Sequence, residues 1–268
     1  MKAPTNFEEK TVVLTGGSRG LGLYAAQTLH NRGARVIVGA RSRGELNEKI
    51  RHIPLDLANL DSIAEFAHTL GDTPIDCLIN NAGVLYPPAT HVHGCEAHIG
   101  INFLGPFALT QMLYPQLTSD GRTVHVTSMV ARFVQYNDAN VRGFKAYAVS
   151  KLANLLFALA LAEKDTQHKA IAAHPGYTAT QLQHSLKLGR LGNYLIGQPL
   201  PCGAKSLIKA CTDPGLTSGQ LVGPRRVMQL RGNPELLPIY NSASSTETRA
   251  SLWAFAEQVL KLKFNPTG

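Results

Sequence analysis

Thr11-Val-Val-Leu-Thr-Gly-Gly-Ser-Arg-Gly-Leu-Gly22 is the stretch that decides the expected fold. Its first five residues form a short β-branched run, and a helical pattern from Leu23 to Asn31 follows the glycines. Gly33 stops that helix, and residues 34–40 have the composition of a second buried strand. The glycines allow a tight turn and the close approach of a pyrophosphate to the free N–H groups that begin the helix. The unit therefore predicts a dinucleotide site, with a plain tight turn as the alternative.

Strand and helix patterns alternate along the rest of the chain. We expect strands at 51–57, 75–79, 123–127, 170–173 and 218–224, the last at an edge, and helices at 60–70, 95–117, 152–161, 203–211 and 246–262. Such alternation predicts one α/β domain over residues 1–268: a Rossmann-type, doubly wound parallel sheet of about seven strands flanked by helices. No repeat or linker divides the chain.

Composition narrows the function classes. The 268 residues are 44% hydrophobic and carry a formal charge of +8, but Lys and Arg are scattered, which disfavours a nucleic-acid partner. The four cysteines contain no Cys-x-x-Cys pair, which fits a reducing compartment better than a disulfide framework. The N-terminus has no signal-peptide pattern, and no apolar run approaches the length of a membrane span. We expect a cytoplasmic protein without a membrane anchor.

Three histidines in a short segment raise the question of a metal. His91, His93 and His98 lie close to Cys95 and Glu96. Their spacing matches no zinc pattern, and the first two fall in an expected loop. We expect no metal site.

Tyr147 and Lys151 stand four residues apart at the start of an apolar helical run. On a helix this spacing puts both side chains on one face. A neighbouring ammonium favours the phenolate, so the pair predicts an acid/base device in which the Tyr pKa falls toward neutrality. Taken alone the pair is weak evidence, because a solvated helix face carries such pairs by chance.

Several further motifs occur in the order of one family. They are Thr15-Gly16-x-x-x-Gly20-x-Gly22, Asn80-Asn-Ala-Gly83, Asn102, Ser128, Tyr147 with Lys151, and Pro175-Gly176. Over nearly its whole length the chain resembles the short-chain dehydrogenase/reductase family. Gly223-Pro224 and Leu252-Trp253 are similar to the branch that holds retinol dehydrogenase-like proteins, bacterial ketoreductases and protochlorophyllide oxidoreductases.

The resemblance implies a set of catalytic residues. Ser128 would polarise a carbonyl oxygen, although Thr127 beside it could be confused with it, and Tyr147 would donate the proton. Lys151 would lower the Tyr147 pKa and hold the nicotinamide ribose. Asn102 would kink its helix and hold a water that links Lys151 to solvent; a satisfied core amide is the alternative.

The same resemblance implies the cofactor contacts. They correspond here to Gly16, Ser18, Arg19, Gly20, Leu21, Arg41, Asp56, Leu57, Asn81, Ala82, Gly83, Tyr147, Lys151, Pro175, Gly176 and Thr178. Asn81 is expected to be mainly structural, and Asp56 could equally be a helix cap or a turn residue.

Cofactor choice depends on the end of the second strand. NAD-specific proteins carry an acid there, whereas this chain has the neutral Ala40 followed by Arg41. With Arg19 in the glycine turn, Arg41 suits a ribose 2′-phosphate, because guanidinium groups offer forked, charged donors. We expect NADP(H). The alternative is that Arg41 and Arg43 are ordinary surface residues.

Together these features predict NADPH-dependent reduction of a ketone or aldehyde, or the reverse oxidation. Residues 181–201 are expected to form an apolar lid over a small, hydrophobic substrate. A light-driven, protochlorophyllide-type double-bond reductase and a nonenzymatic NADP(H)-sensing protein are the rival functions. The resemblance also implies a homodimer or homotetramer built on the Asn102 and Tyr147 helices, with a monomer as the alternative.

Overall fold

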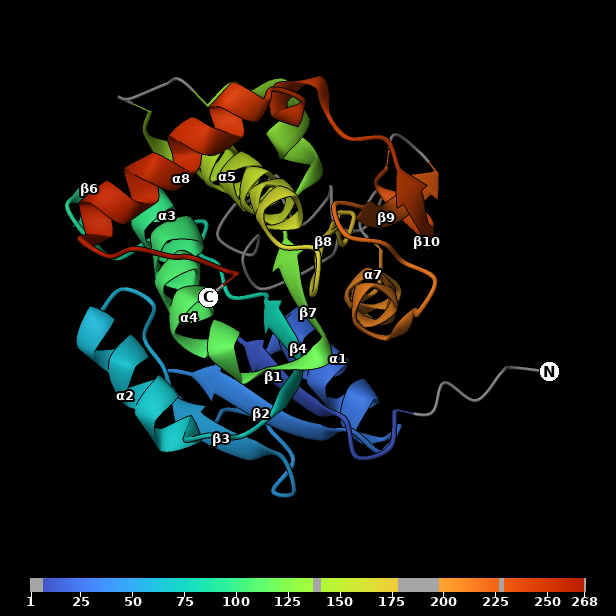
Figure 1. The fold of residues 1–268 in the computed structure, drawn as a ribbon. Helices are drawn as coiled ribbons and strands as arrows, with labels where there is room; N and C mark the ends of the chain where they lie inside the picture. Colours follow the sequence, from blue (N-terminus) through green and yellow to red (C-terminus); the bar gives the residue numbers. More distant parts are fainter. Residues whose placement is uncertain (1–6, 137–140, 178–197, 227–228, 268) are drawn as a thin grey trace.

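One eight-stranded sheet organises the residues that the computed structural model describes, which are 7–136, 141–177, 198–226 and 229–267. Its order is β10-β9-β8-β7-β4-β1-β2-β3 (Figure 1). The strands are β1 (Thr11–Thr15), β2 (Arg35–Ala40), β3 (Arg51–Pro54), β4 (Ile75–Asn80), β7 (Leu117–Val126), β8 (Lys169–Ala173), β9 (Leu221–Arg226) and β10 (Arg231–Leu237). Among the described strands of this sheet, only β9 and β10 pair antiparallel. The predicted doubly wound α/β sheet is confirmed.

Helices cover both faces of this sheet (Figure 1). One face carries α1 (Gly20–His30) and α7 (Leu200–Thr212), and the other carries α2 (Leu60–Leu70), α4 (Gly105–Leu113), α5 (Gly143–Lys164) and α8 (Thr246–Leu260). Alternation along β1 shows why both faces are buried. Val12 and Leu14 join the core under α1, and Val13 between them joins the opposite core.

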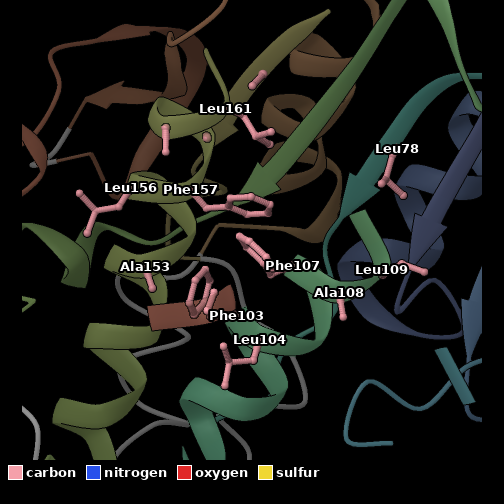
Figure 2. Close-up of a cluster of buried hydrophobic side chains, with 14 of the residues drawn as sticks. Leu78, Phe103, Leu104, Phe107, Ala108, Leu109, Ala153, Leu156, Phe157 and Leu161 are labelled. Atoms are coloured by element: carbon pink, nitrogen blue, oxygen red, sulfur yellow. The ribbon is translucent and has the colours of Figure 1, made fainter. Parts of the chain in front are cut away.

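The larger core is centred on aromatic rings between α4 and α5 (Figure 2). Phe107 lies 4.9 Å from Phe157 between ring centroids and 5.1 Å from Trp253 of α8. Phe103 packs edge-on against both Phe107 and Phe157. Burying each phenylalanine contributes roughly 1.5–3 kcal/mol, so this cluster fixes α5, and with it Tyr147, against the sheet.

The sequence placed several boundaries incorrectly. The sheet has eight strands, close to the expected seven. The additional strand, β10, folds back on β9 and takes the edge position expected for residues 218–224. β7 begins at Leu117 rather than Thr123. Polar residues and a glycine follow Leu117, and a register irregularity separates Leu117 from the regular pairing with β4. The tertiary pairing overrides the local turn composition there.

The helix expected at 95–117 is broken into pieces. β5 (His91–Val92) pairs with β6 (Cys95–Glu96), and then follow α3 (Ala97–Ile99), a π-helical segment η1 (Gly100–Leu104), α4 and the 3₁₀ turn η2 (Tyr114–Gln116). Gly100 permits the contact between hairpin and helix, since a Cβ there would lie 2.5 Å from the Val92 carbonyl oxygen. The expected local break near Asn102 takes the form of this π-helical turn.

Helix α5 is long and apolar enough to cross a membrane by length and composition. However, 83% of its most apolar window is buried within the protein. The helix therefore has the burial of a core element.

Candidate active site

The turn after β1 brings two glycines into contacts that no side chain would fit. Gly16 has φ +70°, and a Cβ on it would lie 2.9 Å from Ala82 Cα. A Cβ on Gly22 would lie 2.3 Å from the Gly16 carbonyl oxygen. Helix α1 thus starts directly against its own entry turn and against the segment after β4. These two turns meet at the carboxyl ends of β1 and β4, where the strand order reverses and α/β sheets bind ligands.

The remaining geometry of this turn suits an anion. Gly20 has φ +58°, and the space where its Cβ would stand is open. Arg19 caps α1 without a side-chain hydrogen bond, and no acidic residue occupies the first turn of the helix. The first N–H groups of α1 and the positive end of its dipole therefore meet no acidic side chain. A pyrophosphate fits this cradle, so the residues are those a dinucleotide requires.

Asn81 links the two turns. Its amide nitrogen donates to the Thr15 carbonyl oxygen at 2.8 Å and to that of Gly16 at 3.3 Å. The Thr15 hydroxyl in turn accepts the backbone N–H groups of Asn81 and Ala82 at 3.1 and 3.0 Å. The Asn81 side chain thus holds the glycine turn in position, which is the structural role expected for it.

Asn102 is fully buried in η1 and hydrogen-bonds the backbone of the segment after Gly83. Its Oδ1 accepts the Val84 N–H at 2.7 Å, and its Nδ2 donates to the Val84 carbonyl at 3.0 Å and to the Ser150 hydroxyl at 3.0 Å. A Cβ on Gly83 would come within 3.0 Å of Lys151 Nζ. The amide therefore holds the backbone beside Lys151. These direct bonds correspond to the satisfied core amide, and nothing in them tests the water relay.

Lys151 is buried, with 5% of its surface exposed, and its Nζ donates to the Val126 carbonyl at 3.3 Å. Asn154 donates to the same oxygen at 3.1 Å. Burial lowers the pKa of Lys151 to about 8, because the charged ammonium loses its hydration. The ammonium thus sits close to its titration range near neutral pH.

Ser128 is the hydroxyl that acts on Tyr147, because hydrogen bonding from its side chain lowers the Tyr147 pKa. Thr127 is occupied elsewhere: it is buried and donates to the Lys151 carbonyl at 2.7 Å. Of the two neighbouring hydroxyls, Ser128 is therefore the one that meets Tyr147. Ser128 also caps the 3₁₀ turn η3 (Met129–Phe133), where its oxygen accepts the Val130 N–H.

The Tyr147 pKa differs from the sequence-based expectation. Burial raises it to about 12, and the hydrogen bond with Ser128 only partly opposes this effect. Lys151 lies with Nζ 5.8 Å from the Tyr147 ring centroid. The expected fall toward neutrality is wrong for this structure, since the loss of hydration around the phenol is the larger effect.

Cofactor-selecting residues lie in the short connection between β2 and β3. Residues 41–50 contain no helix; instead Arg43 donates to the carbonyls of Asn47 at 2.9 Å and Ile50 at 3.2 Å. Gly44 rests on the glycine turn, where its Cβ would stand 2.4 Å from the Ser18 carbonyl oxygen. Arg41 is exposed and makes no hydrogen bond or ion pair with the described residues. Arg43 has a local structural role, and Arg41 does not.

Asp56 and Leu57 follow β3. The Asp56 carboxylate accepts the Ala58 N–H at 3.0 Å, a turn contact, whereas Asn59 caps α2. Leu57 is buried, and its carbonyl meets His93 Nε2 at 2.9 Å. Of the readings left open for Asp56, the turn is the one observed.

Pro175 and Gly176 follow β8 and are tied to the chain around them. The Gln198 amide donates to the Pro175 carbonyl at 2.5 Å, and the Gly176 N–H donates to His174 Nδ1 at 3.3 Å. His174 Nε2 then donates to the Gln229 carbonyl at 3.0 Å. Thr178 and almost all of the expected lid lie outside the described residues; the last two residues of that range, Leu200 and Pro201, begin α7.

The sequence did not identify the contact between His98 and Tyr147, whose ring centroids are 6.2 Å apart. The sequence pattern points to His98 only as a possible metal ligand. In the part of the chain that the structure describes, no three His, Cys, Asp or Glu side chains gather in the manner of a metal site. The available signal was its position four residues before Asn102, on the same helical face.

Comparisons with known proteins identify the family of this chain. Residues 10–190 match the short chain dehydrogenase family. Retinol dehydrogenase 14 of Mus musculus is 31% identical over 95% of this chain and 86% of its own length. A chloroplastic short-chain dehydrogenase of Brassica napus, TIC 32 B, is 30% identical over 77% of each chain.

Solved structures agree as well. A crystal structure of an uncharacterised protein from Mycobacterium paratuberculosis is 34% identical, with a TM-score of 0.75 over 97% of this chain and 96% of its own. An NAD(P)-dependent gluconate 5-dehydrogenase from Beutenbergia cavernae with bound NADP, 24% identical, shares the fold with a TM-score of 0.66 over 82% of this chain and 96% of its own. The chain therefore belongs to the short-chain dehydrogenase family of oxidoreductases.

Proposed function

We propose that this protein reduces a ketone or aldehyde with NADPH, or carries out the reverse oxidation. One observation carries the proposal: Ser128, Tyr147 and Lys151 lie together. Gly83 packs against Lys151, and it belongs to the segment after β4 that contacts the glycine turn. A hydroxyl pair beside a buried cation can bind a carbonyl oxygen and deliver a proton to it.

The cofactor would be held by the glycine turn and the N-terminus of α1, and it supplies hydride. Ser128 donates a hydrogen bond to the substrate oxygen. Tyr147 then transfers its proton to that oxygen, and its raised pKa keeps the proton available up to alkaline pH. Lys151 stabilises the phenolate that remains, and Asn102 holds the backbone at Val84 beside it. General acid catalysis of this type contributes ~10²–10⁴-fold.

NADP(H) is the proposed cofactor in preference to NAD(H). Ala40 at the end of β2 offers no carboxylate for a ribose hydroxyl, and the exposed guanidinium of Arg41 follows it. Arg19 adds a second exposed cation in the neighbouring turn. A 2′-phosphate would accept hydrogen bonds from two guanidinium groups here. A ribose without that phosphate would lack the carboxylate that usually binds its hydroxyls.

An apolar substrate is the proposed class. Tyr86, Phe133 and Phe144 are large exposed aromatic residues, and each stands on a segment that carries site residues. Phe144 lies 6.0 Å from Tyr147 between ring centroids. The name of one relative, retinol dehydrogenase 14, indicates an apolar alcohol as that protein's substrate.

Location and assembly remain proposals: a cytoplasmic protein, and a homodimer or homotetramer. α8 packs on α5 through Trp253, which covers part of the face expected for assembly. Sedimentation velocity at several concentrations tests the assembly, and a single monomer species would contradict it.

The decisive experiment measures NADPH oxidation against a panel of aliphatic and aromatic ketones and aldehydes, with NADH in parallel. We expect turnover with NADPH and a preference for apolar carbonyls. Tight NADPH binding without turnover of any carbonyl would contradict the proposal and favour the sensing alternative.

A further inference from the structure

His98 is held on two sides by oxygen atoms. Its Nδ1 lies 2.7 Å from Glu96 Oε1, and its Nε2 lies 2.9 Å from the Leu85 carbonyl oxygen. The ring is buried, with 3% of its surface exposed. A carbonyl oxygen only accepts hydrogen bonds, so Nε2 donates to Leu85. The Glu96 carboxylate holds Nδ1 on the other side of the ring.

Glu96 also fixes the backbone that carries this ring. Its second carboxylate oxygen accepts the His98 N–H at 2.8 Å and so caps α3. One carboxylate therefore restrains both the main chain and the side chain of His98. A buried group held at three points keeps a single orientation.

His98 contacts two parts of the active site, the Leu85 carbonyl and the Tyr147 ring. Through Leu85 it holds the residue next to Val84, which Asn102 grips with two hydrogen bonds. In addition, its ring lies edge-on to the Tyr147 ring, at 6.2 Å between centroids and 71° between planes. His98 and Asn102 thus act on consecutive residues of the segment that follows Gly83 beside Lys151.

We propose that His98 is a positioning residue: held at Nδ1 by Glu96 and donating from Nε2 to Leu85, it fixes the Gly83–Leu85 segment and the ring of Tyr147. The inference rests on the proposed function for its kinetic consequence. Among the described residues, the titratable groups recorded in contact with the ring are Glu96 and Tyr147, and Lys151 lies against the Tyr147 ring in turn.

The kinetic test compares His98→Gln with His98→Asn. A Gln amide reaches as far as Nε2 and can still donate to Leu85, whereas an Asn amide reaches only the position of Nδ1. We expect His98→Asn to lower kcat at saturating substrate and NADPH by about tenfold or more, since small misplacements at a reacting centre cost that much. His98→Gln should restore most of the loss, and the NADPH dissociation constant should change little in either variant.

A second histidine provides the matched control. His168 Nδ1 pairs with Asp165 Oδ2 at 2.7 Å, its N–H is bonded to the same carboxylate, and its ring lies edge-on to Tyr114. That cluster follows the C-terminal end of α5, about 27 Å along the helix from Tyr147 at 1.5 Å per residue. His168→Asn should lower the thermal unfolding midpoint and leave kcat unchanged.

Equal losses of kcat in His98→Asn and His98→Gln, or no loss in either, would overturn the inference. If Tyr147→Phe keeps full activity, or no carbonyl is reduced, the proposed function fails instead. In that case ¹⁵N NMR of the histidines at neutral pH still decides the arrangement, with the His98 signals assigned from His98→Gln. A proton on Nε2 of His98 supports it, and a ring protonated on Nδ1 alone refutes it.

Discussion

Lys151 Nζ lies 5.8 Å from the centroid of the Tyr147 ring, one helical turn away on α5. Burial moves the two pKa values apart: it raises the pKa of Tyr147 from 10.0 to about 12 and lowers that of Lys151 from 10.5 to about 8. At neutral pH the phenol therefore holds its proton. A protonated phenol is the form that the proposed reduction requires of Tyr147.

Tyr147→Phe removes the proton donor and leaves the ring in place. We expect kcat for carbonyl reduction to fall by ~10²–10⁴-fold, the usual contribution of general acid catalysis. The NADPH dissociation constant, measured by fluorescence, should stay within a few-fold of the value for the wild-type protein.

Ser128→Ala should lower kcat more than Thr127→Val does. Thr127 is the matched control, because its hydroxyl donates to the Lys151 carbonyl instead. If the Thr127 variant loses more kcat than the Ser128 variant at equal stability, the assignment of Ser128 is wrong.

The alkaline limb of the pH profile should report Lys151. Its ammonium loses the proton as pH rises through about 8, so kcat for reduction should decline above that pH. Lys151→Arg keeps its charge throughout this range, because a guanidinium does not deprotonate in proteins. The variant should have lower activity but no decline near pH 8. An unchanged limb in Lys151→Arg would show that another group titrates there.

Arg41→Ala should change cofactor choice. Loss of a charged hydrogen bond costs about 1.5–3 kcal/mol, so NADPH affinity should fall by roughly 10- to 100-fold while NADH affinity changes little. Arg35→Ala is the matched control, because Arg35 is an exposed arginine at the opposite end of the same strand. Parallel losses for NADPH and NADH in Arg41→Ala would refute the 2′-phosphate contact.

Gly44→Ala tests how the connection after β2 supports the glycine turn. The added Cβ would meet the Ser18 carbonyl oxygen at 2.4 Å, and the backbone has φ +56°. Displacing Ser18 should weaken NADPH and NADH alike, by about tenfold or ~1.4 kcal/mol. Gly71→Ala has a similar φ of +63° with open space around the Cβ, so it should cost stability only. If both variants bind the cofactors normally, the connection after β2 does not support the glycine turn.

Acid should destabilise the protein through His174. Burial lowers its pKa from 6.5 to about 4, so the unfolded chain binds a proton in this window and the folded chain does not. Stability is therefore lost as pH falls from 6.5 toward 4, by about 3 kcal/mol from this residue. Urea unfolding across that range measures the slope, and His174→Gln should reduce it. A slope that His174→Gln leaves intact would assign the effect to other groups, of which buried His125, whose pKa is lowered to about 3, is the first to test.

Local sequence patterns were sufficient for the fold class and the family. The alternation of buried strands with helices and the glycine turn after β1 depend on neighbouring residues, and the structure confirms the doubly wound sheet they predict. The order of Asn102, Ser128, Tyr147 and Lys151 carried the resemblance in the same way. Boundaries were less certain where a long-range pairing overrides local composition, as at the start of β7 and in the added strand β10.

Only the tertiary structure decided how the site residues act on one another. Whether Thr127 or Ser128 meets Tyr147 depends on α5 packing beside the end of β7, and the direction of the Tyr147 pKa depends on how much water that packing removes. The contact of Gly44 with Ser18 and the bond from His98 to Leu85 likewise join segments that are apart in the chain. The sequence by itself determined which residues could do the chemistry, because residue type and spacing are local properties. Burial and partners come from packing between distant segments, so only the folded chain determined what each residue can do.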